Sequence, residues 1–146
     1  MKRITVLLAD DNRVVRSVFR EILELEDDLE VVGEAKDGRQ AVAMVKRLRP
    51  ALVLMDVAMP LLNGLQATRQ ILENALLHTK VLILSGHSDE AYVVEAVNSG
   101  AMGYLIKHAS AGTVCHAIRE VQKGNTFFSP SIPKRLRTRN GKKSRD

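Results

Sequence analysis

Five polar residues each follow a short apolar segment of the sequence, where their side chains could act together. They are Asp10, Asp11, Asp56, Ser85 and Lys107. Clustered carboxylates repel one another unless a positive charge lies among them. If folding gathers these residues, the three carboxylates predict a site for a hard divalent cation, with a hydroxyl and an amine beside it.

Magnesium suits this set, because it takes oxygen ligands, keeps several waters and pairs with phosphate oxygens. We expect Asp11 and Asp56 to bind Mg²⁺ directly and Asp10 to act through a water molecule. A carboxylate can also attack phosphorus and form an aspartyl phosphate. Lys107 would neutralise charge on the phosphoryl oxygens in the transition state, and Ser85 would donate a hydrogen bond to one of them.

Each of these residues has a simpler interpretation when it is taken alone. An aspartate pair such as Asp10-Asp11 commonly caps a helix or lies in a solvated turn. Ser85 would ordinarily be a hydroxyl at a strand end, and Lys107 a surface amine. Their joint placement after four apolar segments favours the site.

The segments that must position these residues alternate between two periodicities. Strand-like runs occupy residues 4–9, 29–35, 52–55, 81–84 and 104–106. Helical spacing follows each run, across residues 14–23, 41–48, 65–75, 91–98 and 114–121. Asp37 and Ser110 are placed to begin two of the helices and Gly100 to end one.

This alternation predicts an α/β fold of five βα units, a doubly wound parallel sheet with helices on both faces. The first, third and fourth strands are the most apolar, so we place the second and fifth at the edges, in the order 2-1-3-4-5. Ligands of such sheets lie beyond the carboxyl ends of the strands. The five polar residues all fall there.

Several motifs resemble the receiver domains of two-component response regulators, which have this flavodoxin-like fold. They are Leu8-Ala9-Asp10-Asp11, Leu54-Met55-Asp56-Val57-Ala58-Met59-Pro60 with Asn63-Gly64, Leu82-Ile83-Leu84-Ser85-Gly86, and Gly100-Ala101-Met102-Gly103-Tyr104-Leu105-Ile106-Lys107. The resemblance implies that a sensor histidine kinase or phosphotransfer protein phosphorylates Asp56. It also implies Mg²⁺ bound by Asp11, Asp56 and the backbone carbonyl of Ala58.

The resemblance implies a conformational switch as well. Ser85 would move towards the new phosphoryl group and Tyr104 would turn inward behind it, although Tyr104 alone is also typical of a half-buried aromatic on an edge strand. Ala58 and His87 occupy positions that tune the lifetime of the phosphate in the family. Such a domain is a signalling phosphoacceptor that catalyses only its own phosphorylation and dephosphorylation, rather than an enzyme.

Lys107-His108, where many receivers have proline after the lysine, resembles the subclass that carries LuxR-type DNA-binding domains. That subclass implies a homodimer formed on phosphorylation. We expect a receiver in residues 1–124 and a basic linker or tail in residues 125–146. The tail shows no recognition helix. Two interpretations remain: a stand-alone receiver, or the receiver portion of a DNA-binding regulator whose effector domain is missing here. The tail has no obvious domain start, which slightly favours the stand-alone receiver.

Composition and charge exclude other classes. The net charge is +5, but residues 133–146 hold seven basic residues and one acidic residue, so the rest carries a net charge of −1. The body is therefore not a nucleic-acid binder, and contact with nucleic acid is left to the tail or a missing domain. No apolar run is long enough to span a membrane. The single cysteine, Cys115, favours the cytoplasm.

Two alternatives fit the motifs less well. A phosphatase of the haloacid dehalogenase type has a second aspartate two residues after the nucleophile, and Asn12 stands in that place after Asp10. A nucleotide-binding module needs a glycine-rich first turn, and the acidic pair here would repel a pyrophosphate.

Overall fold

The structure is a computed structural model that describes residues 2–87 and 89–138. The strands in these residues are β1 (Ile4–Ala9), β2 (Leu29–Ala35), β3 (Leu52–Met55), β4 (Lys80–Ser85), β5 (Gly103–Ile106) and β6 (Phe127–Phe128). The α-helices are α1 (Arg13–Glu24), α2 (Gly38–Leu48), α3 (Gly64–Glu73), α4 (Glu90–Asn98) and α5 (Ala111–Gln122). A short 3₁₀ helix, η1 (Lys134–Leu136), follows β6.

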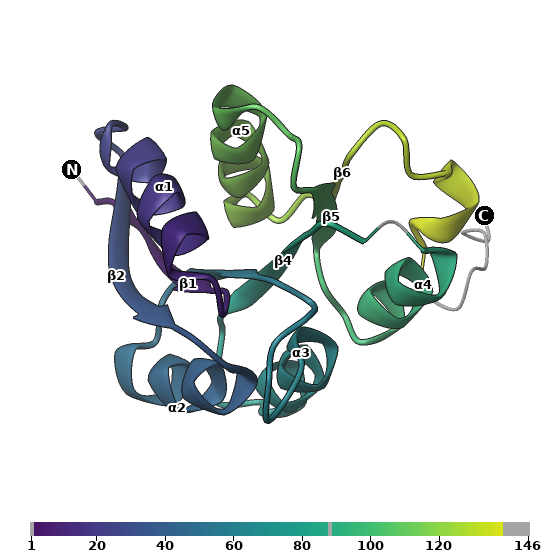
Figure 1. Cartoon of the computed structure of the whole chain (residues 1–146), viewed down its shortest axis with the longest axis horizontal. Coiled ribbons are helices and arrows are strands. Elements are labelled where there is room, and N and C mark those ends of the chain that lie inside the picture. Colours follow the sequence, from purple (N-terminus) through teal and green to yellow (C-terminus); the bar gives the residue numbers. More distant parts are fainter. Residues whose placement is uncertain (1, 88, 139–146) are drawn as a thin grey trace.

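The strands form one parallel sheet in the order β2-β1-β3-β4-β5-β6 (Figure 1). The α/β class and the order of the first five strands are confirmed. The prediction of a five-stranded sheet with β5 at its edge is wrong, because β6 pairs with β5 and takes the edge. Among the described residues, no helix is long and apolar enough to cross a membrane.

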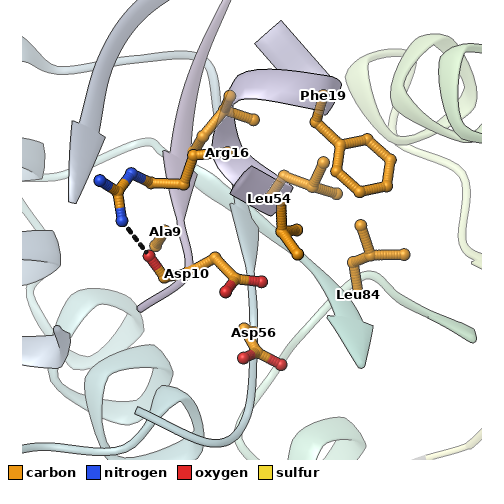
Figure 2. Close-up of a pocket in the computed structure, with 9 residues that line it drawn as sticks. Ala9, Asp10, Arg16, Phe19, Leu54, Asp56 and Leu84 are labelled. Atoms are coloured by element: carbon orange, nitrogen blue, oxygen red, sulfur yellow. Dashed lines mark hydrogen bonds between the residues drawn. The ribbon is translucent and has the colours of Figure 1, made fainter. Parts of the chain in front are cut away.

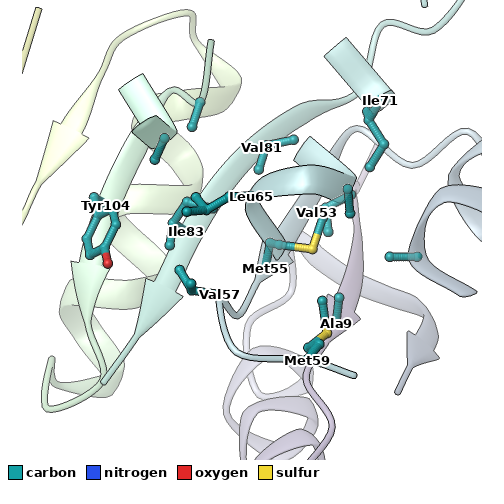
Figure 3. Packing of buried hydrophobic residues seen from close by; sticks show 14 of the residues in the cluster. Ala9, Val53, Met55, Val57, Met59, Leu65, Ile71, Val81, Ile83 and Tyr104 are labelled. Carbon is teal, nitrogen blue, oxygen red and sulfur yellow. The ribbon is translucent and has the colours of Figure 1, made fainter. Parts of the chain in front are cut away.

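Helices cover both faces of the sheet (Figure 1). On one face α1 and α5 pack over a core that includes Leu8, Leu54 and Ile118. On the other face α2, α3 and α4 enclose a second core, part of which is drawn in Figure 3. β1, β3 and β4 contribute to both cores, which explains why their segments are almost continuously apolar.

Side-chain caps fix the starts of most helices close to the site. The predicted caps are confirmed: Asp37 accepts a hydrogen bond from the Gln40 amide and Ser110 from the Thr113 amide. Gly100 has the left-handed φ of +100° that suits the end of a helix. The predicted extent of the third helix, to residue 75, is wrong because α3 ends at Glu73.

Candidate functional site

The backbone of the sheet places the predicted residues at one edge. The Asp10 amide donates to the carbonyl of Ala35 (3.0 Å) and the Asp56 amide to that of Ala9 (2.9 Å). The Lys107 amide likewise donates to the carbonyl of Ser85 (2.9 Å). The ladder therefore continues one residue past each of these strands, and it fixes the backbone from which the functional side chains project.

The three carboxylates converge at this edge. Asp10, Asp11 and Asp56 each offer an oxygen, and these oxygens lie within 4.8 Å of one another. Asp10 and Asp56 are buried, whereas Asp11 is exposed. A set of three carboxylate oxygens open to solvent on one side fits a hard divalent cation that keeps part of its water shell.

Lys107 supplies positive charge from the neighbouring strand. Its Nζ lies 2.8 Å from Oδ2 of Asp10 and 3.4 Å from Oδ2 of Asp56. The other oxygen of Asp10 accepts a hydrogen bond from the Asn12 amide (2.8 Å). Both oxygens of Asp10 thus already have protein partners, which agrees with a role for Asp10 through water rather than as a direct ligand.

The surroundings of Asp56 disfavour its negative charge more than they favour it. Burial raises the pKa of Asp56, the charge of Asp10 raises it further, and Lys107 offsets only part of the effect. For Lys107, burial acts to lower the pKa, but the hydrogen bond to Asp10 and the charge of Asp56 outweigh it, so its pKa is raised. Negative charge on Asp56 is therefore costly without a further cation, while Lys107 stays protonated.

A glycine holds the loop after β3 close to Asp56. The Gly64 amide donates to the carbonyl of Val57 (2.8 Å), and a Cβ at position 64 would overlap the carbonyl oxygen of Asp56. The Val57 amide in turn donates to Oδ1 of Asp56 (2.9 Å). Gly64 thus lets the first turn of α3 approach the backbone of Asp56, and the loop orients the carboxylate.

The predicted switch residues lie behind the cluster. Ser85 and Tyr104 are both fully buried. The Tyr104 hydroxyl donates to the carbonyl of His87 (2.6 Å), and the His87 amide donates to Oγ of Ser85 (3.0 Å). Tyr104 therefore lies in its inward position, and Figure 3 shows its ring beside the core of the sheet.

The two residues predicted to tune the phosphate lifetime lie on the loops that border the site. Ala58 is exposed on the loop after β3, and His87 is exposed after β4. The imidazole of His87 packs edge-on against Tyr92 of α4, with ring centroids 5.5 Å apart. Their effect on lifetime stays a prediction.

Sequence reasoning missed Arg16. This residue of α1 donates from Nη1 to the carbonyl of Asp10 (2.8 Å) and from Nε to Glu34 of β2 (2.9 Å). Figure 2 shows the hydrogen bond from its guanidinium to the backbone of Asp10, and Arg16 lines a small pocket together with Asp10 and Asp56. Arg16 fixes the backbone that carries the acidic pair, and its position in a helical run gave no sign of this.

The doubly wound sheet, with an acidic cluster and a lysine at its carboxyl edge, defines a domain of the receiver type. Residues 6–119 match the family model of the response regulator receiver domain, and the chain belongs to that family. Its relatives are response regulators of the LuxR/NarL group.

Two curated relatives illustrate the similarity. The transcriptional regulatory protein DegU of Brevibacillus brevis is 36% identical over 134 residues, which are 92% of this chain and 56% of DegU. The response regulator protein VraR of Staphylococcus aureus is 35% identical over 141 residues, 97% of this chain and 67% of VraR. The chain thus spans a little over half the length of DegU and about two thirds of VraR.

Two solved structures match the fold closely. The signal receiver domain of the response regulator NarL from Mycobacterium tuberculosis has a TM-score of 0.82 at 31% identity, with 86% of this chain and 100% of that one covered. A LuxR-family response regulator from Aurantimonas sp. SI85-9A1 has a TM-score of 0.84 at 30% identity, with 90% and 93% covered.

Proposed function

We propose that this receiver accepts a phosphoryl group on Asp56 in a Mg²⁺-dependent reaction, with a sensor histidine kinase or a phosphotransfer protein as donor. The observation that carries the proposal is the convergence of three carboxylates within 4.8 Å, with the amine of Lys107 against two of them. Family membership supports the same function, because receiver domains are signalling proteins.

In the proposed reaction, a carboxylate oxygen of Asp56 attacks the phosphorus of the donor. The bond between phosphorus and the donor breaks, an aspartyl phosphate forms, and the donor leaves with the bonding electron pair. Lys107, held by Asp10 at 2.8 Å, stabilises the negative charge on the phosphoryl oxygens. When bound by Asp11, Asp56 and the backbone carbonyl of Ala58, Mg²⁺ supplies further neutralisation of that charge.

Ser85 would move towards the new phosphoryl group. Tyr104, for which the resemblance implies an inward turn, is already inward here, and we propose that it keeps this position behind the phosphoryl group. Ala58 offers only a methyl group to guide an attacking water, and His87 borders the same opening. We propose that these two residues set how long the phosphate lasts.

We further propose that the output is control of transcription. The curated relative DegU is named as a transcriptional regulatory protein, and this chain spans 56% of its length. On this proposal residues 1–124 form the receiver and residues 125–146 the basic linker or tail, of which residues 127–136 pack back on the receiver and residues 139–146 lie outside the described part of the chain. Phosphorylation favours a homodimer. Light scattering with and without beryllofluoride tests the dimer, and an unchanged mass would contradict it.

Radiolabelled acetyl phosphate tests the central proposal. We expect Mg²⁺-dependent labelling of the wild-type chain, loss of the label in Asp56→Asn, and loss of it in EDTA. Asp27→Asn, an exposed aspartate outside the site, is the matched control and should be labelled normally. A label that survives Asp56→Asn refutes the assignment, and a label mapped to Asp10 would support phosphatase chemistry instead.

A further inference from the structure

After α5 the chain returns to the sheet instead of leaving it. We call residues 127–137 the strap. Its first two residues pair in parallel with β5, Phe127 beside Gly103 and Phe128 beside Tyr104. A Cβ at position 103 would overlap the carbonyl oxygen of Phe127, so glycine is required for this close approach.

Ser129 fastens the strap to β5 at two points. Its amide donates to the carbonyl of Tyr104 (3.0 Å), and its hydroxyl oxygen accepts the amide of Ile106 (2.9 Å). Ser129 is itself buried, at 6% exposure. It therefore holds the backbone of β5 on both sides of Leu105, between the switch tyrosine and Lys107.

The rest of the strap packs on the same side of the molecule. Ile132 and Leu136 are buried in the core that contains Tyr104. Arg135 pairs with Glu90 at the start of α4 (2.7 Å). Arg137 donates to the carbonyl of Ile132 (2.6 Å) and so closes the turn of the strap. The strap is joined both to β5 and to α4.

A continuous series of hydrogen bonds links this strap to the site. The His87 amide reaches Ser85, the Tyr104 hydroxyl reaches the carbonyl of His87, and the Tyr104 carbonyl accepts the Ser129 amide. These three bonds connect four segments in turn: β4, the loop after it, β5 and the strap. A displacement of Ser85 or Tyr104 would therefore change the contacts that dock the strap.

We propose that Ser129 is a positioning residue through which the strap and the phosphoacceptor site are coupled. This proposal rests on the proposed function. A docked strap holds Tyr104 inward, the arrangement that the phosphorylated site requires. Coupling between two sites is reciprocal. Phosphorylation at Asp56 thus tightens the strap, and a loosened strap weakens the hold of the site on a phosphoryl group.

The test uses the full chain with Mg²⁺ and beryllofluoride as the phosphoryl mimic. Calorimetry measures the affinity for the mimic, and amide hydrogen exchange follows residues 127–137. We expect the mimic to slow exchange in the strap of the wild type. Ser129→Ala should bind the mimic more weakly, by up to about tenfold, the full effect of losing one net hydrogen bond from the docked strap. Ser131→Ala, on the exposed part of the same segment, should match the wild type.

Arg135→Gln provides a second variant that leaves the core intact, because Arg135 is exposed. It should speed exchange in the strap and weaken binding of the mimic by a smaller factor than Ser129→Ala. If the wild type binds no mimic, the proposed function fails and the coupling falls with it. If the mimic binds but exchange in the strap is unchanged, or both variants bind it as tightly as the wild type, the coupling alone is refuted.

Discussion

Removing the negative charge at Asp56 should make the metal-free protein more stable. The carboxylate oxygens of this cluster lie within 4.8 Å of one another. At an effective dielectric constant of about 20, two unit charges at that distance repel each other by about 3.5 kcal/mol. At the 3.4 Å between Lys107 and Asp56 the interaction is about 5 kcal/mol. Asp56→Asn gives up one such attraction and relieves two repulsions, from Asp10 and Asp11.

The two repulsions relieved exceed the one attraction lost by about 2 kcal/mol, so the variant should have the larger free energy of unfolding. Because Asp11 is exposed, solvent screens part of its repulsion, and we expect a gain of about 1 kcal/mol. The raised pKa of Asp56, caused first by burial and then by Asp10, indicates the same sign. Lys107 keeps its partner Asp10, so the substitution leaves no unpaired ammonium group.

Urea and thermal unfolding in EDTA measure this difference. A gain of 1 kcal/mol corresponds to a melting temperature higher by about 3–5 °C in a chain of this size. In millimolar MgCl₂ the difference should shrink or reverse, because the wild type gains more from the cation. Glu73→Gln, which removes an exposed charge at the end of α3, is the control and should change little. An Asn variant no more stable than the wild type in EDTA would refute the account of an electrostatically strained site.

Three further predictions test other parts of the structure. Asp11→Asn should abolish most of the rise in melting temperature that MgCl₂ gives the wild type; an undiminished rise would remove Asp11 from the metal site. Gly64→Ala should lower the free energy of unfolding in urea by about 1–3 kcal/mol, since the new methyl group overlaps the backbone carbonyl of Asp56. Its control, Gly112→Ala in open space on α5, should instead stabilise the protein by up to about 1 kcal/mol, and equal effects would contradict the reasoning. The hydrogen bond from Arg119 lowers the pKa of Asp28 from its ordinary 3.8, so that pair stabilises the fold above this pH and ceases to do so as the pH falls through the lowered value. Arg119→Gln should therefore lose about 0.5 kcal/mol at neutral pH and move the midpoint of acid unfolding to higher pH, whereas an unmoved midpoint would show that the pair contributes nothing.

The site could be predicted because its residues stand at the ends of regular strands. Once residues 4–9 and 52–55 are read as neighbouring parallel strands, Asp10 and Asp56 must lie side by side. The same reasoning brought Ser85 and Lys107 to this edge. Distances between the groups, and the two partners of Lys107, depend on side-chain packing and needed the structure.

The sixth strand could not be predicted in the same way. β6 consists only of Phe127 and Phe128, and a strand of two residues is too short to show a periodicity in the sequence. Their pairing with β5 requires glycine at position 103, because a side chain there would overlap the backbone of Phe127. The two positions are more than twenty residues apart in the sequence. Arg16 escaped notice for a similar reason, since its contact with Asp10 arises from how α1 lies against the sheet.

The short β6 strand also has a consequence for solubility. An unpaired strand at the border of a sheet exposes a row of amides and carbonyls that can recruit strands from other molecules. β6 and Ser129 cover these groups on β5, and Gly103 leaves that border without a side chain to obstruct an incoming strand. A chain shortened before residue 127 should therefore aggregate at concentrations at which the full chain remains dispersed.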